Sequence, residues 1–123
     1  MSWTISKEFH FSASHQLAGL PETHQCARLH GHNYILVAKL ESDTLKMPGF
    51  VLDYGELTFV KDAADAMDHR HLNDLFDFNP TSELIIQELW KQFIKFVPMD
   101  VDLSVGLSET PKTWAWYDGP TSR

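Results

Sequence analysis

The strongest constraint on the fold is an alternating run of residues that begins with two histidines. His30 and His32 flank Gly31, and apolar residues continue on the same parity. These residues are Tyr34, Leu36, Ala38 and Leu40. Because alternate side chains leave the same face of a β-strand, the pattern predicts a strand over residues 32–42 with one buried face. The two imidazoles then lie together at one end of that face, where they can chelate one metal ion.

A second alternating run, at the start of the chain, adds a third histidine. Its apolar members are Trp3, Ile5, Phe9, Phe11 and Ala13, and His15 continues their parity. A single histidine near a strand end is more often packed or hydrogen-bonded than metal-bound. Beside His30 and His32, however, His15 would complete the set of three nitrogen ligands typical of catalytic zinc, which keeps its fourth position open.

A lone thiol precedes the pair of histidines. Cys26 is the single cysteine of the chain, so it has no partner for an intramolecular disulfide, and this favours a reducing compartment. Two hypotheses remain open for it. The thiol either closes a structural zinc site as a fourth ligand, or stays free for chemistry beside an open catalytic site.

Composition limits the classes of protein that fit. A chain of 123 residues with 43% hydrophobic residues can bury one core, so we expect a single domain over residues 1–123. A net charge of -7 argues against a nucleic-acid surface. No basic, apolar leader and no long apolar run is present in the sequence, so we expect a cytoplasmic protein that does not contact a membrane.

The middle of the chain predicts two helices. Asp53 and Glu56 form a signal like a capping box before an apolar stripe, and Asn79, Pro80 and Thr81 begin a second helix that ends at Pro98. The stripe consists of Leu57, Val60, Ala64 and Met67.

Period two returns in the last third, from Val101 to Leu107 and from Lys112 to Tyr117. The order is therefore ββααββ, which predicts an α+β fold with a four-stranded antiparallel sheet and both helices on one face. Exposed sheet edges would be protected if several copies closed into a barrel, so we expect a homo-oligomer.

Two polar sites at the ends of elements are further candidates. Asp68 and His69 follow the first helix directly, and such a pair either orients a proton-transfer group or is simply solvated. Glu109 follows Leu107 on the apolar parity of the third strand. The pattern alone favours a strand end that reaches water over a binding role for this carboxylate.

Taken together, these residues resemble the family of 6-pyruvoyl-tetrahydropterin synthase and 6-carboxytetrahydropterin synthase. The similarity runs through nearly the whole chain in the family's order. The segments that carry it are 11–15, 26–34, 53–57, 68–69 with 72–73, 80–83, and 109–110 with Tyr117. Thr58 and Leu84 depart from the family's usual lysine and asparagine at these positions.

The resemblance implies a tunnelling fold, with trimeric barrels that stack in pairs as hexamers and active sites between subunits. It also implies zinc as cofactor, held by His15, His30 and His32, and 7,8-dihydroneopterin triphosphate as substrate. Cys26 matches the catalytic thiol, and Asp68 and His69 match its proton-relay partners. Glu109 matches the residue that anchors the pterin ring.

The spacing around Cys26 looks more like the 6-carboxytetrahydropterin branch, a carbon-oxygen lyase that releases triphosphate and acetaldehyde, with queuosine biosynthesis among the pathways it serves. The alternatives are 6-pyruvoyl-tetrahydropterin synthase activity on the same substrate and a non-catalytic module that binds zinc or pterin. Because the chain is acidic, the triphosphate needs a local cluster of cations, for which Arg28, Arg70 and Lys112 are the candidates.

Overall fold

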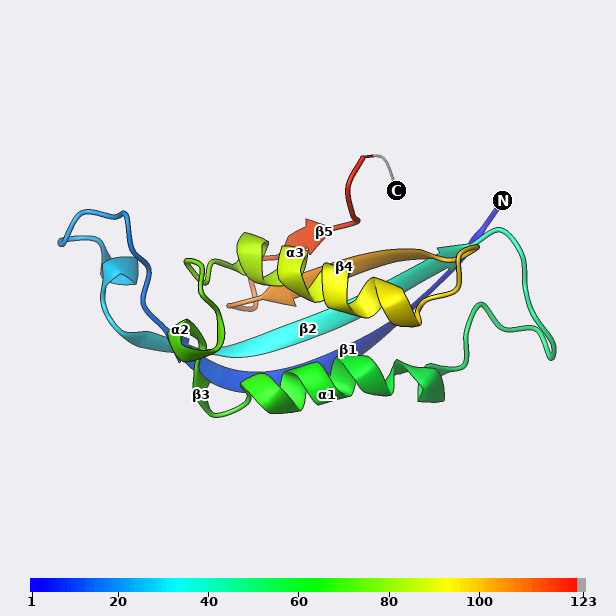
Figure 1. Ribbon diagram of the computed structural model, residues 1–123, viewed down its shortest axis with the longest axis horizontal. Helices are drawn as coiled ribbons and strands as arrows, with labels where there is room; N and C mark the ends of the chain where they lie inside the picture. Colours follow the sequence, from blue (N-terminus) through cyan, green and yellow to red (C-terminus); the bar gives the residue numbers. More distant parts are fainter. Residues whose placement is uncertain (122–123) are drawn as a thin grey trace.

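Two long strands form the centre of the fold (Figure 1). In this computed structural model, which describes residues 1–121, β1 (Trp3–His15) and β2 (His30–Ser42) pair antiparallel along their whole length. The register places His15 opposite His30, because one strand ends where the other begins. The two predicted strands and the parity of their apolar residues are thus confirmed.

Three shorter strands complete a sheet of order β3-β1-β2-β4-β5. β4 (Asp102–Ser108) pairs antiparallel with β2, and β5 (Ala115–Tyr117) pairs antiparallel with β4. At the other edge, β3 (Arg70–His71) pairs parallel with β1. The prediction of four antiparallel strands is therefore wrong: the sheet is mixed and has five strands. A strand of two residues is too short to show a period of two, so no pattern of residues indicates β3.

Both main helices lie on one face of the sheet, as Figure 1 shows. α1 (Thr58–Met67) packs along β1, and α3 (Ser82–Phe93) packs on β4 and β5. A short helix, α2 (Leu72–Leu75), follows β3 and lies close to the end of β1. Single turns of 3-10 helix occur at η1 (Gln25–Ala27), η2 (Tyr54–Leu57) and η3 (Ile94–Phe96).

The predicted start of the second helix is confirmed at Thr81, whereas the first helix, α1, begins later than predicted. Asp53 caps η2 rather than α1, since its carboxylate accepts a hydrogen bond of 2.9 Å from the N–H of Gly55. The side chain of Thr81 caps α3 by accepting from the N–H of Leu84, whereas the side chain of Asn79 is bonded elsewhere. Loop residues with capping chemistry thus mark helix starts correctly to within one turn.

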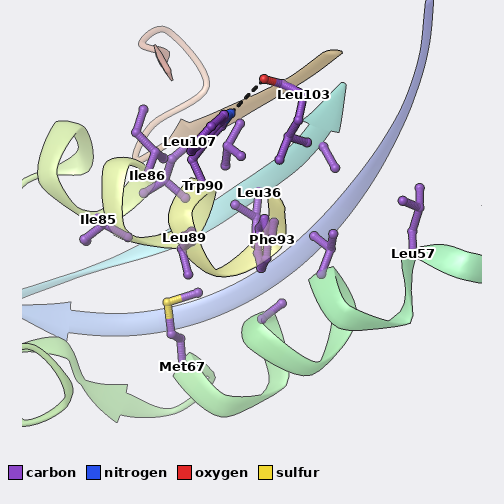
Figure 2. Packing of buried hydrophobic residues seen from close by; sticks show 14 of the residues in the cluster. Leu36, Leu57, Met67, Ile85, Ile86, Leu89, Trp90, Phe93, Leu103 and Leu107 are labelled. Atoms are coloured by element: carbon purple, nitrogen blue, oxygen red, sulfur yellow. Dashed lines mark hydrogen bonds between the residues drawn. The ribbon is translucent and has the colours of Figure 1, made fainter. Parts of the chain in front are cut away.

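The core lies between this helical layer and the sheet (Figure 2). The predicted stripe on α1 is confirmed, because all four of its residues are buried. From α3, Trp90 points into the same layer, and its Nε1–H donates to the carbonyl of Leu103 on β4 at 2.9 Å (Figure 2). This close-packed layer supports β1 and β2, which carry the histidines at the end of one strand and the start of the other. Within residues 1–121, no helix combines the length and apolar character needed to cross a membrane.

Candidate functional site

Three histidines meet where β1 ends and β2 begins. One ring nitrogen from each of His15, His30 and His32 lies within 4.8 Å of the others. His15 is fully buried, and the other two are half-buried. The three Nε2 atoms are buried and have no hydrogen-bond partner within residues 1–121. Because buried polar atoms are normally hydrogen-bonded, three such atoms facing one another indicate a site that could hold a metal.

Backbone carbonyls fix the orientation of two of these rings. Nδ1 of His15 lies 2.8 Å from the carbonyl of Pro80, and Nδ1 of His30 lies 2.7 Å from the carbonyl of Arg28. A carbonyl can only accept, so each Nδ1 carries the hydrogen and donates it. The lone pair of the neutral ring then sits on Nε2, which is the arrangement by which proteins direct a histidine at a metal.

The environment also favours neutral rings. Burial lowers the pKa of His15 and of His32 below the ordinary value. This outweighs the opposing effects, which are the hydrogen bond to Pro80 and then the carboxylate of Glu109 for His15, and the carboxylate of Glu109 for His32. A neutral imidazole is the form that binds a metal, because protonation consumes the lone pair. Both rings are therefore ready to act as ligands near neutral pH.

Glu109, at the end of β4, is close to this cluster. Its Oε2 lies 3.1 Å from Nε2 of His32, a distance typical of an ion pair, although the contact lacks hydrogen-bond geometry. The hydroxyl of Ser82 donates to the other oxygen, Oε1. The side chain of Glu109 is only 26% exposed, so the expectation from pattern alone, a carboxylate that simply reaches water, is wrong.

Glu109 also lines a hollow of about 410 Å³ together with Trp114 and Trp116, which we call the aromatic hollow. The two indole rings stack with their centroids 5.7 Å apart. Flat aromatic faces beside a carboxylate suit a flat heterocycle that carries N–H donors, because the rings provide stacking and the carboxylate accepts paired hydrogen bonds.

A second hollow, of about 450 Å³, is lined by His32, His69, Arg70 and His71, and we call it the histidine hollow. Of the predicted pair, His69 lines this hollow, and Oδ2 of Asp68 is 3.0 Å from Nδ1 of His69, whose side chain is 83% exposed. The other carboxylate oxygen accepts the N–H of Ser12 at 2.8 Å.

That hydrogen bond from Ser12, followed by the one from His69, lowers the pKa of the Asp68 carboxyl, so Asp68 is charged at neutral pH. The charged carboxylate keeps the hydrogen of His69 on Nδ1 and leaves Nε2 free to exchange a proton.

Cys26 sits in η1, half-buried, on the loop that joins β1 to β2. Its N–H donates to Nδ1 of His24 at 3.0 Å, which forms the turn. The group of three histidines does not include Cys26. A closed site with the thiol as fourth ligand is therefore not what the structure describes in residues 1–121.

Several contacts of the site have no signal in the sequence. The carbonyls of Arg28 and Pro80 orient the histidines, and any residue could supply them. Ser82 was visible only as part of the segment 80–83, and the tryptophans only as members of an aromatic strand.

The chain is similar to known proteins of one family over nearly its whole length. The family model described as 6-pyruvoyl tetrahydropterin synthase matches residues 4–120. A 6-carboxy-5,6,7,8-tetrahydropterin synthase from a Synechocystis species is 39% identical over 90 residues, which cover 68% of this chain and 68% of that protein. The protein of the same name from Bacillus subtilis is 26% identical, over 94% of this chain and 85% of its own. The resemblance described from the sequence is confirmed, as is the prediction of an enzyme like the 6-carboxytetrahydropterin synthases.

Solved structures agree with this result. The 6-pyruvoyl tetrahydropterin synthase of Caenorhabditis elegans superposes with a TM-score of 0.83 at 26% identity, covering 98% of this chain and 97% of that one. The protein from Plasmodium vivax, at 21% identity, has a TM-score of 0.74 over 95% of this chain and 97% of its own, and shows the shared fold. The tunnelling fold of these neighbours is thus the fold of this chain.

Proposed function

Since this chain belongs to the 6-pyruvoyl tetrahydropterin synthase family, we propose that it converts 7,8-dihydroneopterin triphosphate to 6-carboxy-5,6,7,8-tetrahydropterin, with release of triphosphate and acetaldehyde. The observation that carries the proposal is the group of three unpartnered Nε2 atoms with a carboxylate 3.1 Å from one of them. A buried cluster of this kind is costly unless a ligand completes it. The names of the curated relatives, from Synechocystis and Bacillus subtilis, favour the carboxy product.

Zinc is the metal that fits best. Three imidazoles, with neither a thiolate nor a carboxylate in the group, match a catalytic zinc site, which retains one open position. His15, His30 and His32 would hold the ion through Nε2. When bound, zinc supplies Lewis-acid polarisation of the substrate's side-chain hydroxyl groups, which makes their protons easier to remove near neutral pH.

Glu109 and the aromatic hollow would bind the pterin ring. The carboxylate accepts hydrogen bonds from the amino and N–H groups of the ring, and Ser82 keeps it in place through Oε1. Trp114 and Trp116 offer the faces on which the ring stacks. Held in this way, the ring lies beside the histidine cluster, because Glu109 contacts His32.

Proton transfer falls to Cys26 and to His69 with Asp68. His69 can take or give a proton at Nε2 while Asp68 holds Nδ1. Because the side chain of His69 is 83% exposed, we propose that this pair completes its site against a second copy of the chain in a homo-oligomer. Arg70 lines the same hollow and is the cation that we assign to the triphosphate.

The test is product analysis. The purified protein, loaded with zinc, is incubated with 7,8-dihydroneopterin triphosphate, and acetaldehyde, triphosphate and the pterin product are quantified. The proposal requires acetaldehyde and triphosphate in equal amounts. Triphosphate with a pyruvoyl product and no acetaldehyde would move the assignment to 6-pyruvoyl-tetrahydropterin synthase activity, the name carried by the Caenorhabditis elegans neighbour.

A non-catalytic module that binds zinc or pterin is the second candidate, and Cys26→Ala separates it from an enzyme. In the catalytic account the variant loses activity but keeps its zinc, because the histidines hold the metal. Loss of zinc and of folding together would favour a structural site closed by the thiol.

A further inference from the structure

Two asparagine side chains hydrogen-bond to the backbone of the segment that directly follows β1. Oδ1 of Asn73 accepts the N–H of Gln16 at 2.9 Å, and its Nδ2 donates to the carbonyl of Gln16 at 2.8 Å. Asn79 does the same to Ala18, with distances of 2.9 Å and 3.1 Å. Each side-chain amide therefore bonds to both the N–H and the carbonyl of one residue, as a residue of a neighbouring strand would.

The opposite edge of the same segment holds the loop with the thiol. The N–H of Leu17 donates to the carbonyl of Cys26 at 3.0 Å, and Nε2 of Gln16 donates to the carbonyl of Ala27 at 2.9 Å. In an extended segment, backbone groups of successive residues point to opposite sides. Residues 16–18 are thus bound on one side by the asparagines and on the other by η1, the turn that carries Cys26.

Little else fixes this loop. None of residues 16–29 is buried, and Figure 1 shows the loop between β1 and β2 extending beyond the end of the sheet, with α2 beside its base. A segment with few buried contacts is placed mainly by its hydrogen bonds. Asn79 is available for this role because Thr81, not Asn79, caps α3.

We infer that Asn73 and Asn79 are positioning residues that hold the Cys26 turn against the end of β1, next to the histidine cluster. The inference rests on the catalytic role proposed above for the thiol. It depends on the side-chain amide at both positions, because the amide offers its donor and its acceptor side by side, whereas a carboxylate would face the backbone carbonyl with a second acceptor.

The experiment uses the full chain loaded with zinc and the variants Asn73→Ala, Asn79→Ala and both together. Gln92→Ala is the matched control, since the exposed amide of Gln92 donates to Glu88 one turn earlier on α3. Four quantities are measured for each protein: the rate of Cys26 alkylation by iodoacetamide, hydrogen exchange of the Leu17 amide, kcat with KM, and zinc content. Cys26 is the single cysteine, so alkylation reports on this loop alone.

In the double variant, which loses four hydrogen bonds, we expect alkylation and exchange to accelerate by at least about tenfold, since loss of a single net hydrogen bond already approaches that factor. We expect kcat to fall roughly 10- to 100-fold, as misplacement of a reacting group does, with KM and zinc content nearly unchanged. The alkylation rate, the exchange rate and kcat of the single variants should lie between those of the double variant and the wild type. The comparison therefore does not depend on whether the double variant folds.

Unchanged alkylation and exchange in all three variants would overturn the inference, as would equal changes in Gln92→Ala. Faster alkylation and exchange with a normal kcat would also overturn it, because the asparagines would then hold the loop without affecting the reaction. Failure of the proposed function is distinguishable: a wild-type protein that releases no acetaldehyde refutes that function, while the alkylation and exchange rates still report whether the asparagines hold the turn.

Discussion

Oε2 of Glu109 lies 3.1 Å from Nε2 of His32. This contact joins the two parts of the site, since His32 belongs to the candidate metal cluster and Glu109 lines the aromatic hollow. A ring bound by the carboxylate would therefore lie next to the three histidines. The distance between the ring anchor and the ligand set determines which substrate atoms can reach the metal position.

Replacing Glu109 by glutamine should weaken substrate binding. The variant keeps the shape but loses the charge, and it presents an N–H₂ group to ring donors, so kcat/KM should fall roughly 10- to 100-fold, the factor associated with a hydrogen bond to a charged group. Ser82→Ala removes only the support of Oε1 and should cost less than Glu109→Gln. Steady-state kinetics measure both, with Glu88→Gln on α3, where Glu88 bonds to Gln92, as control. Equal kinetics for Glu109→Gln and the control would remove Glu109 from the binding site.

Removal of one histidine ligand should release the metal. His30→Ala leaves two imidazoles, so its zinc affinity should drop by more than the roughly 10- to 100-fold that loss of an outer-shell partner causes. Metal analysis after dialysis should find about one zinc per chain in the wild type and almost none in the variant. His10→Ala is the matched control, because His10 is exposed on β1 beside Glu8. Full zinc content in His30→Ala would mean that the metal, if any, lies elsewhere.

Asp68 should make the protein sensitive to acid. Its pKa is lowered in the folded state, first by the N–H of Ser12 and then by His69, so its stabilising contribution is fully present above the unfolded pKa of about 3.9. That contribution is lost as the pH falls through the lower folded pKa. Urea unfolding between about pH 3 and 6 should show a steeper loss of stability in the wild type than in Asp68→Asn. Parallel curves would show that the carboxylate is not held in this way.

Two phenylalanines that contact the same ring should differ strongly in their effect on stability. Phe93 is 2% exposed and Phe96 is 62% exposed, yet both pack on Phe59, at centroid distances of 5.4 Å and 4.9 Å. Phe93→Ala should lower the free energy of unfolding by about 3–5 kcal/mol because it leaves a cavity in the core. Phe96→Ala should cost about 1 kcal/mol or less. Urea denaturation compares them, and equal losses would contradict the packing described.

The alternation of residues was enough to predict which face the histidines occupy. His15, His30 and His32 share the parity of buried neighbours. This parity belongs to each strand alone and does not depend on how the two strands pair. Parity does not fix the register, however, and only the pairing of His15 with His30 brings the rings together. From the sequence, the resemblance to a family was what predicted that the three rings meet around one metal.

Contacts made by the backbone or across long separations could not be predicted. The carbonyl of Pro80 orients His15 from 65 positions away, and Asn79, interpreted as a helix cap, instead binds Ala18. β3 was missed because its pairing with β1 depends on the sharp turn at His69, which has a positive φ of 59°. In each case the partner is set by tertiary structure, not by local residue preference.

Titration of zinc into the metal-free protein tests the central claim most directly. Zinc is added in steps to the chelator-treated chain with excess 7,8-dihydroneopterin triphosphate, and acetaldehyde release is followed. Our account predicts that the rate rises in proportion to zinc and levels off at one equivalent per chain, in the wild type but not in His30→Ala. Full acetaldehyde release without metal, or a protein saturated with zinc that leaves the substrate intact, would contradict it.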